Sequence, residues 1–122
     1  MANELTVSAG LRFAKGSGEQ AYDAAVSKSV QVDVSGTEVS DSIQSIGTST
    51  EALVATDVGT QGYIFLQNLD ATNYCEFTVE SDGTSTLIKL LAGEIAVFRA
   101  SAAVYGKANT AATRIRVVVI EN

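Results

Sequence analysis

The sequence predicts an all-β protein, an antiparallel β-sandwich of about eight strands with a jelly-roll-like arrangement. Apolar residues recur at every second position, and turn residues interrupt them every eight to twelve positions. No segment shows a helical pattern long enough to cover the face of a sheet. Two sheets must therefore cover each other, and eight strands in two sheets is the strand count of a jelly roll.

The chain is expected to begin with a strand or arm region, residues 1–36, followed by a sandwich body, residues 37–122, within one domain overall. Apolar side chains alternate from Leu5 to Phe13, which indicates a half-buried strand. This strand is expected to stop near Gly16, where glycine and serine interrupt the pattern.

A second strand is expected over residues 27–34, where valines share one parity. The segment before it, residues 19–25, has modest helical or loop character. Further strands are expected at residues 39–46 as an edge strand, 51–55, 63–66, 75–80, 87–91, 95–99 and 113–121, with a looser segment at 105–110.

Three segments of the body carry a more specific signal. Residues 63–66 are apolar at consecutive positions, which indicates a central strand covered on both faces. Residues 117–120 form a second continuous apolar run, and we expect this run to lie inside the sheet. Cys75, Phe77 and Val79 share one parity, so their strand is expected to have one buried face and one solvated face.

Aspartates mark several turns of the body. Asp82-Gly83 is the strongest hairpin signal, because a type I′ turn needs positive φ at both central residues. Asp57, Asp70 and Asp82 lie in three separate turns, where aspartate bonds its own downstream backbone. Their spacing does not resemble a calcium-binding loop, so the sequence predicts no metal site.

The residues that catalysis most often uses at neutral pH are largely missing. The chain has no histidine and one cysteine, which argues against Ser-His or Cys-His nucleophiles and histidine-ligated zinc. Glu76 and Glu80 fall on one strand face by their spacing, but we expect that face to be flat and solvated, whereas glycosidases set their acids across a cleft. Cys75 is expected to be a small buried hydrophobe. We predict a protein that is not an enzyme, with no catalytic residue and no cofactor; a small hydrolase of cell-wall sugar using the two glutamates is the minor alternative.

The charge and the first residues limit the partners. The formal net charge is −6, and an acidic surface repels phosphate backbones, so we expect no nucleic-acid partner. Residues 1–20 contain charged side chains and no continuous apolar stretch, which argues against a signal peptide or a membrane anchor. The single cysteine fits assembly in a reducing cytoplasm.

A candidate interface can be drawn from aromatic and apolar residues. Tyr22, Tyr74 and Tyr105 fall near strand ends or in loops, where tyrosines anchor either a subunit interface or a sugar-binding surface. We favour the interface, since aromatic anchors are its usual hot spots. Leu11 and Phe13 of the first strand complete the candidate set.

From about residue 43 onward, the sequence resembles a group of small proteins encoded among the structural genes of tailed bacteriophages. The order of the matching stretches matters more than any one of them, and the second stretch is the most specific. The resemblance rests on residues 43–48 (IQSIGT), 62–74 (GYIFLQNLDATNY), 90–94 (LLAGE) and 105–111 (YGKANTA).

This resemblance implies a β-sandwich component of the virion, assembled in the host cytoplasm, with an architectural role. We expect a capsid decoration or cement protein that binds the major capsid protein and other copies of itself. A closed homo-oligomer is expected, and a trimer is favoured because it matches the threefold points of an icosahedral lattice. The alternative is a component of the neck, tail or tail tip that contacts a host-surface carbohydrate.

Overall fold

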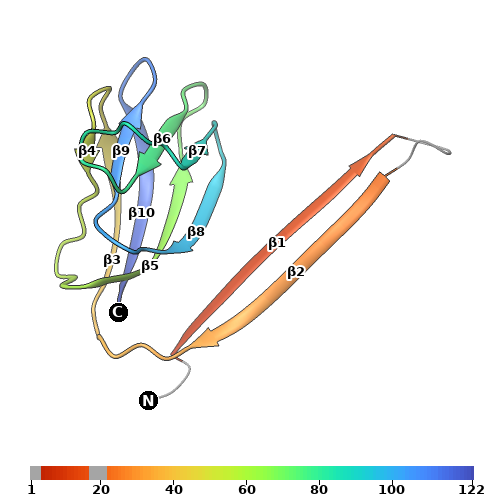
Figure 1. The fold of residues 1–122 in the computed structure, drawn as a ribbon, viewed down its shortest axis with the longest axis horizontal. Helices are drawn as coiled ribbons and strands as arrows, with labels where there is room; N and C mark the ends of the chain where they lie inside the picture. Colours follow the sequence, from red (N-terminus) through yellow and green to blue (C-terminus); the bar gives the residue numbers. More distant parts are fainter. Residues whose placement is uncertain (1–3, 17–21) are drawn as a thin grey trace. The chain divides into compact units, whose positions relative to one another are not determined.

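The computed structural model describes residues 4–16 and 22–122, with residues 22 and 23 described by their backbone alone. The chain divides into two compact units, Met1–Ser35 and Gly36–Asn122 (Figure 1). Within the described ranges all regular secondary structure is β-strand, and every strand pair is antiparallel. The prediction of an all-β antiparallel protein is therefore confirmed.

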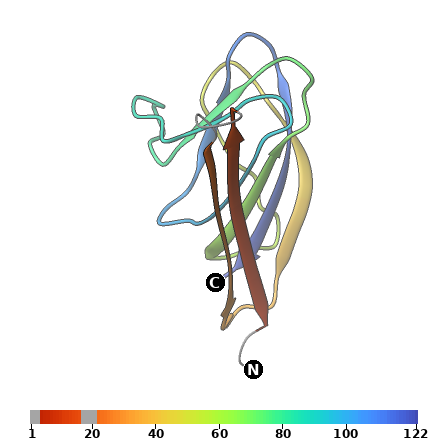
Figure 2. The ribbon, with the colours of Figure 1, turned by 90° about the vertical axis from the view of Figure 1, so that its right-hand side faces the viewer.

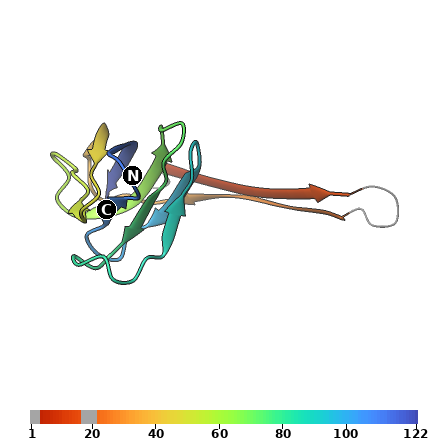
Figure 3. The same ribbon diagram turned by 90° about the horizontal axis from the view of Figure 1, so that it is seen from above.

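The first unit is a two-stranded hairpin formed by β1 (Leu5–Lys15) and β2 (Tyr22–Val32) (Figure 3). The pairing runs without a break from Leu5 opposite Val32 to Lys15 opposite Tyr22. The expectation for β2 was wrong in its bounds, because residues 22–25 are strand rather than helix or loop. Pairing with β1 explains the difference, since an extended β2 gives the backbone groups of β1 their hydrogen-bond partners.

The second unit contains two four-stranded sheets, which Figure 2 shows from a second side. One sheet has the order β3 (Val39–Ile46), β10 (Thr113–Glu121), β5 (Gln61–Asn68), β8 (Ile95–Arg99). The other has the order β4 (Glu51–Ala52), β9 (Tyr105–Ala108), β6 (Cys75–Thr78), β7 (Ile88–Leu90). The predicted bounds of β3, β8 and β10 are confirmed, as is the position of β3 at an edge.

A single core lies between the two sheets of the second unit. It is buried because alternate residues of β5 and β10 point to the same side, where they meet side chains of the other sheet. This arrangement is consistent with the predicted antiparallel β-sandwich. The buried hydrophobic residues are Ile46, Leu53, Ile64, Leu66, Cys75, Phe77, Leu90, Val104, Ala108, Ile115, Val117 and Val119.

Asn68, at the end of β5, is a buried polar residue that ties the sheets together. Its amide group donates to the carbonyl oxygens of Asn73 (2.9 Å) and Leu90 (3.0 Å), and its Oδ1 accepts from the backbone N–H of Asp70 (2.8 Å). Every hydrogen-bonding site that faces the core is therefore used, which is the condition for burying an amide at low cost.

Three expectations for the body were wrong. Residues 105–108 form the strand β9 rather than a looser segment, because they pair with both β4 and β6. Strand β6 ends at Thr78, so the alternation is lost there and Val79 is exposed while Thr78 is buried. Asp82-Gly83 does not form a type I′ turn, because Gly83 has a φ of 70° but Asp82 is not among the described residues with positive φ.

The aspartate turns are confirmed for two of the three residues. One carboxylate oxygen of Asp70 accepts from the backbone N–H groups of Thr72 and Asn73, and Asp82 accepts from that of Thr84. These bonds hold the pKa of both carboxyl groups below the usual range, because they favour the charged form. Both carboxylates therefore serve turn geometry.

Two further carboxylates fix the backbone on either side of the boundary between the units. Within the hairpin unit, Glu4 accepts from the backbone N–H of Val34 at 3.2 Å. Within the body, Glu121 accepts from the N–H groups of Thr37 (3.0 Å) and Gly59 (3.1 Å). The backbone bonds lower the pKa of each carboxyl group. Each unit thus holds its own end of the connecting segment.

Candidate interaction surfaces

The hairpin is amphipathic, with one apolar face and one polar face. Because side chains alternate, odd-numbered residues of β1 share a face with even-numbered residues of β2. Leu11 is 77% exposed and Phe13 52% exposed on this face. We call it the hairpin face; its described residues are Leu5, Val7, Ala9, Leu11, Phe13, Lys15, Ala24, Val26, Lys28, Val30 and Val32.

An uncovered face of this kind is costly in water. A two-stranded ribbon is marginally stable at best unless its apolar face packs on another element. Covering one large aliphatic or aromatic side chain contributes about 1.5–3 kcal/mol, and Leu11, Phe13, Val26 and Val30 are all large and exposed. The hairpin therefore has the character of an element that folds against a partner surface.

Apolar and charged residues share the outside of the sheet β3-β10-β5-β8, where Arg99 and the Asp41–Arg116 ion pair (2.7 Å) lie among apolar side chains. The strand registers place Val118, Phe65 and Val97 side by side, on the two inner strands β10 and β5 and on the edge strand β8. Ile43 on β3 is 58% exposed and Ile95 on β8 is 60% exposed. We call this the outer sheet face; its apolar residues are Val39, Ile43, Tyr63, Phe65, Ile95, Val97, Val118 and Ile120.

The sequence predicts that residues 63–66 are covered on both faces, and the body covers one of them. Ile64 and Leu66 are buried in the core, as expected, and β5 is a central strand. Tyr63 and Phe65 point to the outer sheet face and are half-buried. Among the described residues of the body, no further layer lies on that face, so the expected cover on both faces is not found within these two sheets.

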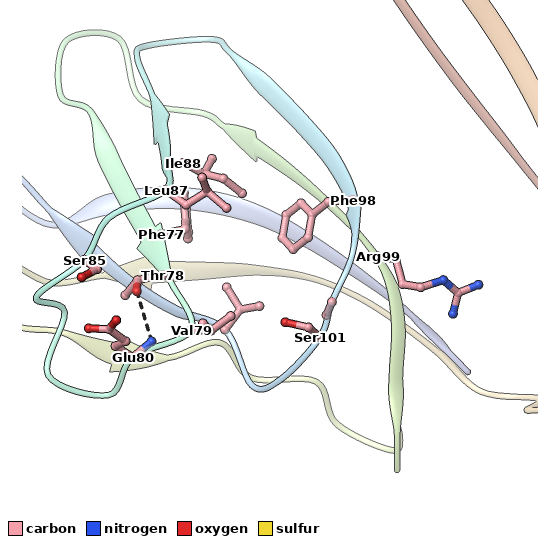
Figure 4. A pocket seen from close by; sticks show the side chains of 12 residues that line it. Phe77, Thr78, Val79, Glu80, Ser85, Leu87, Ile88, Phe98, Arg99 and Ser101 are labelled. Carbon is pink, nitrogen blue, oxygen red and sulfur yellow. Dashed lines mark hydrogen bonds between the residues drawn. The ribbon is translucent and has the colours of Figure 1, made fainter.

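An apolar pocket of about 330 Å³ opens at the end of the sandwich, beside strands β6, β7 and β8. Phe77 is buried and Phe98 half-buried, whereas Leu87 and Val79 are exposed, and Figure 4 shows all four around the pocket. The polar groups there serve the backbone: Thr78 Oγ1 accepts from the N–H of Glu80. The lining can take an aliphatic or aromatic group; its ionisable residues are Glu80 and Arg99, and Figure 4 shows the Arg99 side chain pointing away from the others.

The candidate interface residues are divided between the two units. Leu11 and Phe13 lie on the hairpin face and are exposed, as an interface requires. The backbone of Tyr22 pairs with Lys15, and its side chain lies outside the described residues. Tyr74 and Tyr105 are half-buried in the body.

Tyr74 has a structural contact of its own. The ammonium group of Lys89 lies 4.2 Å from the centre of its ring, within the range of a cation–π interaction. Its backbone N–H donates to the side-chain oxygen of Asn109, and its carbonyl accepts from the N–H of Asn109. This ring therefore stabilises the connection before β6.

The two glutamates considered for catalysis do not share a strand face, which corrects the expectation from their spacing. Glu76 lies on β6, directly between Lys89 and Lys107 of the neighbouring strands. Glu80 lies beyond the end of β6 and accepts a hydrogen bond from the hydroxyl of Thr84. The two carboxylates thus occupy separate surroundings.

Cys75 is buried and unpaired, as the sequence predicts. Burial raises the pKa of its thiol to about 12, because the thiolate would lose its hydration in the core. Among the described residues, no group of three His, Cys, Asp or Glu side chains is placed to hold a metal ion.

The outer sheet face was not identified from the sequence, although a signal for it was present. Ile43, Ile95 and Val97 lie on strands that carry apolar residues at both odd-numbered and even-numbered positions, and therefore on both faces. Apolar residues on both faces indicate a strand that is covered on both sides. Only the register of the four strands shows that these residues form one surface.

No protein-family model, no curated protein and no solved structure matches this chain. Within residues 4–16 and 22–122, the chain has no helix with the length and hydrophobicity to cross a membrane.

Proposed function

We propose that this chain is a non-enzymatic structural protein of a tailed-phage particle, a capsid decoration protein that binds the major capsid lattice and other copies of itself. The observation that carries the proposal is the pair of faces with exposed apolar residues, one on the hairpin and one on the outer side of a sheet. Monomeric proteins rarely expose large contiguous apolar patches, and such patches mark protein–protein contacts.

The strand order supports a jelly roll for the body. Counted along the chain from β3, the first sheet takes the first, eighth, third and sixth strands, and the second sheet takes the second, seventh, fourth and fifth. This alternation between two sheets is what two nested Greek keys produce. Jelly rolls occur in viral capsid and lectin domains, and function has to be argued from surfaces rather than from the fold.

The acidic groups support a role other than catalysis. A catalytic carboxylate usually has a perturbed pKa in a cleft. Here Asp70 and Asp82 serve turns, and Glu121 holds a loop. Glu76 lies between two lysines of neighbouring strands. Three of these four carboxylates bond backbone groups, and the fourth lies on a strand between two cationic neighbours.

The free thiol supports assembly in the host cytoplasm. Cys75 is buried in the core and has no disulfide partner, which suits a reducing compartment. A mature location in the virion follows from the proposed role, with other virion proteins as partners.

Quantitative mass spectrometry of particles produced from the genome that encodes this chain tests the proposal. Hundreds of copies per particle are expected for a decoration protein, since it repeats over the capsid lattice. A handful to a few dozen copies would instead support a component of the neck, tail or tail tip. Absence of the chain from purified particles would overturn the virion role altogether.

A further inference from the structure

We propose that the hairpin face of one copy of this chain packs on the outer sheet face of a second copy, and that the exchange is closed, so each copy gives one hairpin and receives one. This inference rests on the proposed function only in that both include self-association of the chain. It goes further by naming the two surfaces that pack together.

The two faces match in their apolar residues, and the outer sheet face also carries Arg99 and the Asp41–Arg116 ion pair. The hairpin face presents Leu11, Phe13 and Val26 as exposed apolar side chains, and the outer sheet face presents Ile43 and Ile95. Two apolar sheet faces pack together as the two layers of a sandwich do, about 10 Å apart. The outer sheet face of one copy and the hairpin of the other then form a second two-layer sandwich, with the apolar side chains between them.

The charged side chains of the hairpin face do not prevent this contact. Lys28 lies opposite Ala9 in the middle of the hairpin, and Lys15 lies at the end of β1. A lysine can lay its aliphatic stem along an apolar surface while its ammonium group stays in water. The opposite face of the hairpin, which carries Ser8 and Ser29 bonded to each other, stays suited to solvent.

The size of the faces indicates a closed exchange. Each strand of the hairpin has 11 residues. At about 3.4 Å per residue and about 4.8 Å between strands, the flat area of one hairpin face is roughly 350 Å². A standard interface buries about 800 Å² on each partner.

One hairpin packed on one sheet buries less than half of that area on each partner. Two hairpins packed on each other bury no more than this. When every copy both gives and receives, each buries roughly 700 Å². The closed exchange is therefore the arrangement whose area suits a stable assembly, either twofold or threefold.

Size-exclusion chromatography with light scattering on the full chain tests the exchange. We expect the wild type at two or three times the 12.7 kDa of one chain. Val26→Asp places a charge on the hairpin face and should shift the mass to one chain. Ala25→Asp, one residue earlier on the polar face and opposite Arg12, is the matched control and should keep the assembly.

The receiving surface is tested in the same way. Val97→Asp places a charge on the edge strand β8 of the outer sheet face, beside Phe65, and should also give single chains; Ile43→Asp serves if that variant fails to fold. Leu87→Asp changes a more exposed apolar residue beside the pocket (87% exposed, against 39% for Val97) and should leave the assembly intact.

Mixing the two defective variants separates the exchange from other contacts. In a mixture of Val26→Asp and Val97→Asp, the intact hairpin of the second variant can still meet the intact sheet of the first. Because the mixed pair makes only one of the two contacts, roughly 350 Å² on each partner, we expect a heavier species only at concentrations well above those at which the wild type assembles. Stacking of hairpin on hairpin would give no heavier species at any concentration, and that result would overturn the proposal.

A wild type that stays at one chain at tens of micromolar would also overturn the exchange, including the case in which the hairpin covers its own sheet. So would an assembly that survives Val97→Asp and Ile43→Asp. These outcomes are independent of the virion role. A chain that exchanges hairpins but is absent from particles refutes only the proposed function, and one abundant in particles but single in solution refutes only the exchange.

Discussion

Replacing Asn68 by alanine should be among the most destabilising single changes in the body, because this side chain, at the end of β5, satisfies backbone groups of β7 and of the loop that follows β5. It is 1% exposed and makes three hydrogen bonds. A typical net hydrogen bond contributes about 1 kcal/mol, and a buried carbonyl left without a partner costs about 1–3 kcal/mol. The carbonyl of Leu90 is in that position, so Asn68→Ala should lower the free energy of unfolding by about 3–5 kcal/mol.

Guanidinium unfolding followed by circular dichroism measures this loss. For a protein of this size the denaturant slope in guanidinium is about 2–6 kcal/mol per molar, so the midpoint should fall by about 1 M. Gln67→Ala, one residue earlier on the outer face, is the control and should change stability by less than about 0.5 kcal/mol. A loss below about 1 kcal/mol for Asn68→Ala, which is the low end of one orphaned carbonyl, would refute the reasoning.

Three further predictions follow from buried and ionised groups. Cys75 should react with a thiol reagent only as fast as the protein unfolds, because its thiol is buried and its pKa is about 12; fast labelling of the folded protein would contradict this. Gly106→Ala should cost about 1–3 kcal/mol, since the new Cβ would lie 3.0 Å from the ring of Phe77, whereas Gly10→Ala, with no neighbour closer than 3.6 Å, should be nearly neutral in thermal unfolding. The melting temperature should stay constant from pH 8 to pH 6, because the chain has no histidine. It should then fall in acid: the pKa of carboxyl groups such as Glu121 is lowered, so their contribution is complete above the ordinary value of about 4 and is lost as the pH falls through the lowered value. Glu121→Gln should make the fall of the melting temperature in acid less steep. An unchanged dependence of the melting temperature on pH would contradict this role of Glu121.

The regular strands were predictable because their signal is local. Strands β8 and β10 have clear alternation or a continuous apolar run between turn residues, and their predicted bounds agree with the structure. The buried cysteine followed from the same pattern, since Cys75 shares its parity with Phe77. Alternation reports which side chains share a face without reference to the rest of the chain.

The missed elements depend on pairing at a distance. Residues 22–25 have little strand character, yet they are extended because β1 pairs with them over its full length. Residues 105–108 became a strand because β4 and β6 lie on either side. Val79 was expected to be buried, but nothing in the local pattern shows that β6 stops at Thr78.

The interaction surfaces were predictable in part. Leu11 and Phe13 were identified from the sequence and do lie exposed on one face of the hairpin. The outer sheet face was not, because Phe65 and Val97 are far apart in the chain and become neighbours only through the register of β5 and β8. A single sequence indicates that a strand has two apolar faces, but the arrangement of the sheets decides which of them is left uncovered.

Hydrogen–deuterium exchange of the backbone amides of β1 and β2 tests most directly whether the hairpin works by packing on another copy. In the concentrated wild-type protein, we expect the amides of Leu5–Lys15 to be protected, and we expect Val97→Asp to remove this protection while the amides of β5 and β10 keep theirs. Hairpin amides that exchange as fast as those of an unfolded chain in the assembled wild type would contradict the account, because the apolar face would then have no partner.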